Sequence, residues 1–511
     1  MSPISTHRYP DDCSSQDCRR SGVQTSLHDP SFTDLSPYGP QLSDIERDLH
    51  EVLQAARTIK NTFLPVNRLP PEILSTVLEN RTSDLDLVAA THVCRHWRSI
   101  LISTPSFWTR FRFQPTRDVS RALTYFERSK SAPIDIEMNV HSQLDLEFSK
   151  HLAPHIARTR SLIIGGDPDL VHATSLLLRN TAPFLQHLEL HSLGLYAPLP
   201  DNLLSQHVLS LRCLRLRNVG TTFKSPFPLA NLIEFELRLQ EDAAPSCMTT
   251  LFLFLSGSPR LERIRIDTNE VLQDIVPDQF ILLESVVELE YSCGSAGRIL
   301  PYLRLPRLEQ LSVCSQFGFG PVQKLADILP HDGHLLLEGT TKMEYRAYLD
   351  THTLVFHGKN GDATLVMHLD PTNPTPVYWL SDTKYIPFRQ IQELTVGCSS
   401  DNADPPITAF ENLEVLQIAP RSAMFNGPPF TEELFRVLYP GAEVPCHSLR
   451  VVRYTGWEPL DPLISLVKAR LQAGHRLELV ELPTIRKFSR RCVDELRKLV
   501  GEVVIRRLKG T

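Results

Sequence analysis

The segment THVCRHWRSI, from Thr91 to Ile100, contains the residue types in this chain that are best suited to chemistry. His92, Cys94 and His96 stand at alternate positions. Imidazole nitrogens and a thiolate can bind zinc, and a Cys–His pair can act as an activated nucleophile. Both kinds of site require the side chains to converge on one point, so the local secondary structure decides whether either can form.

Apolar residues recur at helical spacing from Leu85 past Ile100, which predicts one continuous helix through this segment. On such a helix each residue advances about 100°, so His92 and His96 share a face and Cys94 points about 200° away from His92. Ligands arranged in this way cannot reach one ion. We therefore expect Cys94 to be a small buried residue, the histidines to lie on the polar side, and the chain to hold no metal and no cofactor here.

Other catalytic patterns are absent from the sequence. HEVLQ (His50–Gln54) lacks the second histidine of the HExxH zinc motif, and HLAPH (His151–His155) has no evident third ligand. The sequence contains no GxSxG elbow, no GxxxxGK[ST] phosphate loop and no GxGxxG following a strand. The sequence therefore predicts a protein that is not an enzyme.

Length and charge limit the classes of partner. A chain of 511 residues exceeds one ordinary core, so it predicts several domains or a repeat array. Its net charge of -6 argues against a nucleic-acid partner for the whole chain. There is no apolar run of about 18 residues, no secretory signal and no CxxC pair. We expect no membrane partner, reduced cysteines, and a cytoplasmic or nuclear location, or both.

The amino-terminal part divides into two segments. Residues 1–40 are rich in Ser, Asp and Pro without apolar periodicity, which predicts a disordered tail. Residues 41–63 carry apolar side chains at steps of three and four, which predicts an amphipathic helix.

A second helix is predicted at LPPEILSTVLE, Leu69–Glu79. Pro70 and Pro71 suit a helix start, where no amide donor is needed, and Glu72 favours the positive end of the helix dipole. The apolar residues of this helix form one stripe: Ile73, Leu74, Val77 and Leu78. A polar loop at 80–84 follows, and TPSFW (Thr104–Trp108) ends the next helix.

Beyond this region the pattern L-x-x-L-x-L recurs, with other apolar residues substituting for Leu. The segments are 185–190, 211–216, 232–237, 261–266, 286–291, 308–313, 391–396, 413–418, 449–454 and 477–482. Most start-to-start spacings fall near the period of 20 to 29 residues that is typical of leucine-rich repeats. The pattern predicts a strand at each segment, with short helices between them.

Two stretches depart from the repeat. Residues 351–369 contain two β-rich runs around an Asn-Gly pair, which predicts a hairpin inserted into the array or replacing one of its turns. The basic run from Ile485 to Gly510 fits either a nucleic-acid or import patch, or a final amphipathic helix and strand. Val493, Leu496 and Val500 keep helical spacing through the charges and favour the second interpretation.

The block at 64–113 resembles an F-box domain of the fungal, basidiomycete type. The shared elements are LPPEIL, then Val93-Cys94-Arg95 with Trp97, then Pro105 and Trp108. The resemblance implies a mixed α/β protein, in which a three-helix F-box is followed by an irregular leucine-rich-repeat solenoid at 114–511.

The resemblance also implies roles for individual residues. The surface that binds the ubiquitin-ligase adaptor would start with Leu69, Pro70, Pro71, Glu72, Ile73 and Leu74. Val77 and Leu78 would extend this adaptor-binding surface or pack the small core. Val93, Trp97 and Trp108 would form the F-box core, holding its three helices together and the F-box to the repeats.

The function implied is that of a non-catalytic substrate receptor. Through the adaptor the chain would join a cullin scaffold, while the repeats would bind an unidentified protein substrate for ubiquitination. One alternative is a leucine-rich-repeat scaffold that binds the adaptor without ubiquitin transfer. Another is an enzyme with a site in the repeats, which would need clustered polar groups with shifted pKa values.

Overall fold

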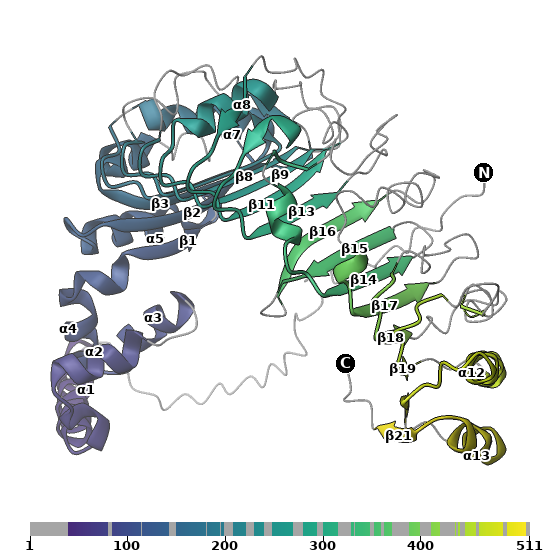
Figure 1. Ribbon diagram of the computed structural model, residues 1–511. Helices are drawn as coiled ribbons and strands as arrows, with labels where there is room; N and C mark the ends of the chain where they lie inside the picture. The colour runs from purple at the N-terminus through teal and green to yellow at the C-terminus, as the bar shows by residue number, and fades with distance from the viewer. Residues whose placement is uncertain are drawn as a thin grey trace, which may run out of the picture. The chain divides into compact units, whose positions relative to one another are not determined.

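The computed structural model describes residues 39–506, with gaps (Figure 1). The residues within this span that it does not describe are 80–83, 114, 143–149, 180, 195, 199–207, 221–228, 240–247, 269–278, 294–299, 315–328, 332, 348–351, 359–361, 370–387, 399–409, 419–434, 436–437, 440–444, 456–458 and 484–487. Almost all of the predicted disordered tail, and the Asn-Gly pair of the predicted hairpin, lie outside the described residues.

The chain divides into two compact units. The first comprises Met1–Asn80 and Val88–Ser99, and the second comprises Arg81–Leu87 and Ile100–Thr511. Residues 100–113, which the sequence assigns to the F-box, therefore belong to the same compact unit as the strands that follow them.

The first unit is helical. Helix α1 (Gly39–Thr62) is followed by a short 3-10 helix, η2 (Pro65–Arg68), and by α2 (Pro71–Glu79). Helices α3 (Asp84–Thr91) and α4 (Arg95–Ser103) each have residues in both units.

The helix predicted from Leu85 past Ile100 is in fact two helices. The His92 amide donates to the Ala89 carbonyl and the Val93 amide to the Ala90 carbonyl, which are i to i−3 bonds that close α3 in a turn. The Thr91 hydroxyl adds a bond to the Val88 carbonyl. Side-chain and backbone bonds of this kind end a helix even where the apolar spacing continues.

The second unit is built on a sheet of 17 strands. Its first nine strands pair in parallel in the order β1 (Arg110–Phe113), β2 (Ile134–Val140), β3 (Thr159–Gly166), β4 (His187–Ser192), β6 (Cys213–Arg217), β8 (Glu234–Leu239), β9 (Arg263–Thr268), β11 (Glu288–Cys293) and β13 (Gln310–Cys314). The last five strands are also parallel: β17 (Glu393–Cys398), β18 (Val415–Ile418), β19 (Val451–Tyr454), β20 (Leu479–Pro483) and β21 (Glu502–Arg506).

Three strands join these two parallel sets. They are β14 (Lys342–Ala347), β15 (His352–His357) and β16 (Ala363–Leu369). Strand β16 pairs in parallel with β13, β15 is antiparallel to both β16 and β14, and β14 pairs in parallel with β17. The two β-rich runs noted at 351–369 are thus β15 and β16, and they form part of the main sheet.

The sheet has one buried face and one open face. Along β4, Leu188 and Leu190 are fully buried while Glu189 between them points the other way, and most other strands alternate similarly. Besides parts of α3 and α4, the described residues of this unit include the helices α5 (Pro115–Arg128), α7 (Pro168–Ser175), α8 (Met248–Ser256), α12 (Asp461–Gln472) and α13 (Arg490–Leu499). Helices α7 and α8 lie together on one side of the sheet (Figure 1).

Short elements are also present in the described part of the second unit. They are the 3-10 helices η3 (Pro105–Trp108), η4 (Ala153–Arg158), η5 (Leu176–Arg179), η7 (Leu300–Tyr302), η9 (Gly333–Leu337) and η10 (Phe388–Gln390), with the two-residue strand pairs β5 (Ala197–Pro198) with β7 (Val219–Gly220), and β10 (Ile281–Leu282) with β12 (Leu303–Arg304). Within the described residues, no helix combines the length and apolarity needed to cross a membrane.

Candidate functional site

The LPPEIL segment forms the start of α2. Pro70 precedes the helix and its carbonyl accepts the amide of Leu74 at 3.0 Å, while Pro71 is the first helical residue. Glu72 lies in the first turn, where its charge complements the helix dipole. The two prolines therefore fix where α2 begins.

The side chains of α2 divide into one buried residue and an exposed apolar pair. Leu74 is completely buried, whereas Ile73 is 51% and Val77 is 54% exposed. Ile73 and Val77 are four positions apart and share a face of the helix. Of the other residues predicted to bind the adaptor, Leu69 and Leu78 are half-buried, and Pro70, Pro71 and Glu72 are exposed.

The three residues predicted to form the F-box core lie in different environments. Val93 is in the turn between α3 and α4 and is 58% exposed, so it does not pack in a core. Trp97 is half-buried in the first unit. Trp108 is 1% exposed, and it belongs to the second unit, where its ring makes an edge contact with Tyr125 of α5 at 4.9 Å.

Cys94 has a structural role that its position before α4 explains. Because α3 ends at Thr91, Cys94 lies outside a helix and precedes α4, and its Sγ accepts the amide of Trp97 at 3.5 Å. This is the bond that an N-cap side chain makes. His92 and His96 are exposed, as predicted. In the part of the chain that the structure describes, no group of three or more His, Cys, Asp or Glu residues could hold a metal ion.

A chain of hydrogen bonds links three elements of the first unit. The Trp97 indole donates to Asn67 Oδ1 at 2.6 Å, and Asn67 Nδ2 donates to the Asn61 carbonyl at 2.8 Å. Asn67 thereby joins α4, η2 and α1. Asn67 was not among the predicted residues, although an amide side chain just before a proline-started helix is suited to bridging backbone and side-chain groups.

A small cavity lies beside this chain of bonds. Its volume is about 150 Å³, and its lining comprises Thr58, Asn61, Thr62, Asn67, Cys94, Arg95 and His96. Arg95 also donates to Gln54 Oε1 at 2.8 Å, which ties the start of α4 to the middle of α1.

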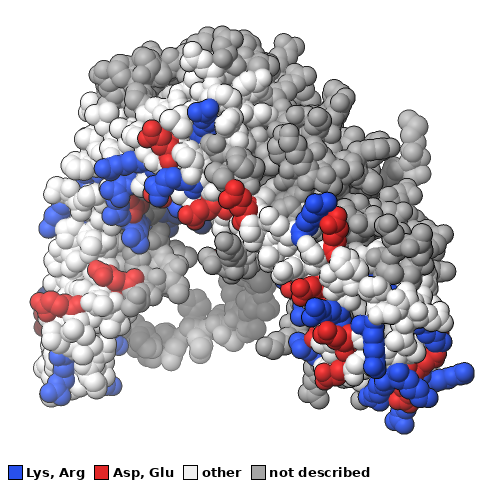
Figure 2. All heavy atoms as spheres, viewed as in Figure 1, with Lys and Arg blue, Asp and Glu red and all other residues white. Residues whose placement is uncertain are grey.

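The open face of the sheet carries side chains of alternating charge. Glu189, Arg215, Glu236, Arg265 and Glu290 occupy the same register position on the neighbouring strands β4, β6, β8, β9 and β11. We call these five residues the charge row. Figure 2 shows acidic and basic side chains intermixed rather than separated by sign.

Ion pairs connect the charge row to its neighbours. Arg215 lies 3.7 Å from Glu189 and 3.6 Å from Glu236, and Arg265 pairs with Glu290. A hydrogen bond from His187 is the largest cause of the lowered pKa of Glu189. Burial raises this pKa, and the charges of Arg217 and Arg215 lower it further. The neighbours of Glu189 therefore hold that carboxylate in its charged form.

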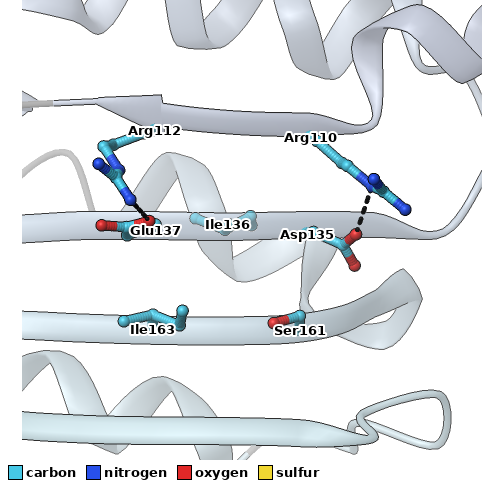
Figure 3. Close-up of a pocket in the computed structure, with 7 residues that line it drawn as sticks. All are labelled: Arg110, Arg112, Asp135, Ile136, Glu137, Ser161 and Ile163. Atoms are coloured by element: carbon cyan, nitrogen blue, oxygen red, sulfur yellow. Dashed lines mark ion pairs between the residues drawn. The ribbon is translucent and has the colours of Figure 1, made fainter. Parts of the chain in front are cut away.

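A cavity opens at the β1 end of the same sheet (Figure 3). It measures about 260 Å³, and its lining comprises Arg110, Arg112, Asp135, Ile136, Glu137, Ser161 and Ile163. Arg110 and Arg112 reach from β1 to the carboxylates of Asp135 and Glu137 on β2, at 3.3 Å and 2.6 Å. Both arginine side chains remain more than two-thirds exposed, at 79% and 74%, so their outer edges can meet a ligand.

The β1 cavity was not predicted, although the sequence contains a signal for it. Arginine alternates with phenylalanine in RFRF (Arg110–Phe113), and acidic residues alternate with apolar ones at the start of IDIEMNV (Ile134–Val140). Two strands with this period pair opposite charges across one face.

Comparison with protein families identifies the amino-terminal region. The F-box-like family model matches residues 66–114, a range that includes α2, α3, α4, η3 and β1. No curated protein matches the chain. F-box domains generally bind Skp1-type adaptors, and F-box proteins are generally non-catalytic. Residues 66–114 thus form an F-box-like domain, which suggests an adaptor-binding role in a ubiquitin ligase.

Proposed function

We propose that this chain is a substrate receptor of a cullin-type ubiquitin ligase. Its F-box-like domain docks on the adaptor, and the open face of its sheet holds a protein substrate. The observation that carries the proposal is the family match at 66–114 together with the exposed pair Ile73 and Val77 on α2. Exposed apolar residues at helical spacing fit a partner that covers them.

The adaptor surface of this proposal is centred on α2. Leu74 is completely buried, while Ile73 and Val77 present apolar area outward. Residues of this kind account for much of the affinity of a helix docked in a groove.

The strand-rich unit supports the substrate-binding half of the proposal. We infer that it is a leucine-rich-repeat solenoid, because each L-x-x-L-x-L segment supplies a strand and consecutive segments supply neighbouring strands on either side of β14–β16. Such arrays bind partners over an extended surface. The charge row and the β1 cavity are where that surface offers polar groups of both signs.

Co-purification of the full chain with a Skp1-type adaptor tests the adaptor interaction. The variant Ile73→Glu/Val77→Glu should lower adaptor recovery by at least about tenfold, because two charges would be buried at the interface. The control Ser43→Glu/His50→Glu adds the same residues on the polar side of α1 and should leave recovery unchanged. Equal recovery of all three chains would rule out the proposed surface.

A second measurement separates the receptor from a scaffold. Proteins labelled by proximity to the wild-type chain should become more abundant in cells that carry Ile73→Glu/Val77→Glu, because they are no longer presented for ubiquitination. If adaptor binding is lost but the abundance of every labelled protein stays the same, the chain is a scaffold without ubiquitin transfer.

A further inference from the structure

Helix α1 carries a regular apolar stripe. Its members are Leu42, Ile45, Leu49, Val52, Ala56, Ile59 and Phe63, the last lying one residue beyond the helix. We call these residues the α1 seam. The steps between them alternate between three and four, which is the a and d spacing of a heptad repeat. A stripe of this period is narrower than the face that a helix presents to a globular core.

The α1 seam faces away from the first unit. The contacts that α1 makes with that unit involve Gln54, which accepts from Arg95, and Asn61, whose carbonyl accepts from Asn67. Thr58 lines the same cavity as Asn61. At 100° per residue these three lie on one side of the helix, about 180° from the middle of the seam. The polar side of α1 is thus the inner side.

The seam is consequently open to water. Leu49 is 67%, Val52 is 69% and Ile59 is 60% exposed, and no residue of α1 is buried. Covering these side chains would remove a large apolar area from water, which favours association with a partner. A continuous row of exposed apolar residues on one helix marks an interaction site.

The charges of α1 identify what covers the seam. Its first half carries Asp44, Glu46, Asp48 and Glu51 with one arginine, and its second half carries Arg57 and Lys60. Two such helices attract each other when they run in opposite directions, because each acidic half then meets a basic half. In a parallel pair like halves would lie together, and the positions that flank the seam would form no ion pair.

We propose that two copies of this chain associate through the α1 seam as an antiparallel coiled coil. Leu49 packs against the partner's Ile59, and Val52 packs against the partner's Ala56. In this register Glu46 stands beside the partner's Lys60 on both sides of the two-fold axis. Gln54 points outward, so its bond to Arg95 is kept. The proposal is independent of adaptor and substrate binding.

Sedimentation of the full chain between about 1 and 100 µM tests the association. The wild type should change from monomer to dimer over this range. The variant Leu49→Glu/Val52→Glu should stay monomeric, because it places four charges in the seam of a dimer. Leu49 and Val52 are exposed in the monomer, so this variant should unfold at the same temperature as the wild-type monomer. The control Ser43→Glu/His50→Glu should dimerise like the wild type. A wild type that is monomeric throughout, or a dimer that survives Leu49→Glu/Val52→Glu, would overturn the proposal.

Charge exchange tests the antiparallel direction. Lys60→Glu alone should weaken the dimer several-fold, because it places like charges side by side twice. Adding Glu46→Lys to the same chain should restore the wild-type dimer. Restoration supports the antiparallel register, and a double variant as weak as Lys60→Glu excludes it. Adaptor recovery should not change in either variant, which keeps this test separate from that of the proposed function.

Discussion

Asn67 shows how one side chain can organise several helices. It accepts the Trp97 indole proton and donates to the Asn61 carbonyl, so the positions of α1, η2 and α4 all depend on it. Both bonds are partly shielded from water, which makes them worth more than exposed ones. The segment around Cys94, whose residue types suggested a metal or nucleophilic site, is thus held in place by hydrogen bonds of an amide, an indole and a thiol.

Removal of the Asn67 side chain should loosen the first unit. We expect Asn67→Ala to lower the free energy of unfolding of that unit by about 1–3 kcal/mol, because two bonds are lost and the indole donor is left unpaired. Asn67→Asp keeps the acceptor for Trp97 and should cost less. Urea unfolding followed by tryptophan fluorescence measures both. Gln54→Ala removes one exposed bond and serves as the control; a loss as large as that of Asn67→Ala would contradict this explanation.

The spacing of apolar residues predicted a helix at α2, but it did not show which of those residues are buried. The stripe of Ile73, Leu74, Val77 and Leu78 covers a wide arc of a short helix, and only Leu74 is fully enclosed. Which part of such an arc is buried depends on the elements packed against it, and these are distant in sequence. Val93 was misplaced for a related reason, because apolar spacing does not register the turn that ends α3.

Helix α12 illustrates how an element is fixed at the residue level. Arg470 near its end is completely buried, and its guanidinium donates to the carbonyls of Pro445 at 2.9 Å and Cys446 at 3.0 Å. Burial lowers the pKa of Arg470, because enclosing the guanidinium disfavours its charged form. Cys446 has a φ of 49°, so the bond also stabilises a backbone shape that is unfavourable for a side chain.

Loss of Arg470 should destabilise the second unit more than loss of an exposed arginine nearby. Arg470→Ala removes the guanidinium donor from the Pro445 carbonyl and one of the donors to the Cys446 carbonyl, which keeps the Leu449 amide. It also opens a cavity, and we expect a loss of about 3 kcal/mol or more. Arg476→Ala removes one bond, to the Val500 carbonyl, from an exposed side chain and should cost about 1 kcal/mol or less. Equilibrium unfolding in urea compares the two variants. Equal losses would show that the buried bonds are not the cause.

The strands were the most predictable elements. All ten L-x-x-L-x-L segments are strands, but each strand begins two residues after its segment does. The first apolar residue lies in a turn instead: the amide of Leu211, for example, bonds to the Val208 carbonyl, and Leu211 is buried. The strands β2, β3 and β14 depart from that spacing and were missed. Residues of β2 alternate between buried and half-buried, whereas β3 ends in three consecutive buried residues.

The stability of the second unit should depend on pH through three histidines. Burial is the largest cause of the lowered pKa of His155, His191 and His368. The charge of Arg158 lowers the pKa of His155 further. The charges of Glu189 and Glu290 partly offset the effect of burial at His191 and His368, respectively. The unfolded chain then takes up protons at a higher pH than the folded chain does. Their contribution to stability is present above the unfolded pKa of 6.5 and is lost as the pH falls through the lower folded values.

Urea midpoints measured from pH 8 to about pH 5 check this expectation. We expect the midpoint to fall as the pH drops below about 6.5. His155→Gln/His191→Gln/His368→Gln removes the titrating groups and should flatten the curve. A curve of unchanged slope in that variant would show that the acid sensitivity arises elsewhere.

For the whole molecule, the types of secondary structure could be predicted from the sequence, but the pairing of distant strands could not. The sequence indicated a helical part followed by many strands, and the F-box-like match at 66–114 confirms the nature of the first part. Spacing alone did not show that β14, β15 and β16 join two parallel sets of strands, because pairing between distant strands leaves no local pattern. The charge row was missed for the same reason.

The pairing of β13 with β16 has a consequence for synthesis on the ribosome, because β14 and β15 lie between these two strands in the sequence. Strand β13 pairs with β11 as soon as it is made, but its other neighbour, β16, is complete only when Leu369 has been added. Until then the growing chain carries a long stack of parallel strands with an open edge, which is a template for association with other chains. A nascent chain that stalls between Cys314 and Leu369 should therefore be the form of this protein most prone to aggregation and most dependent on chaperones.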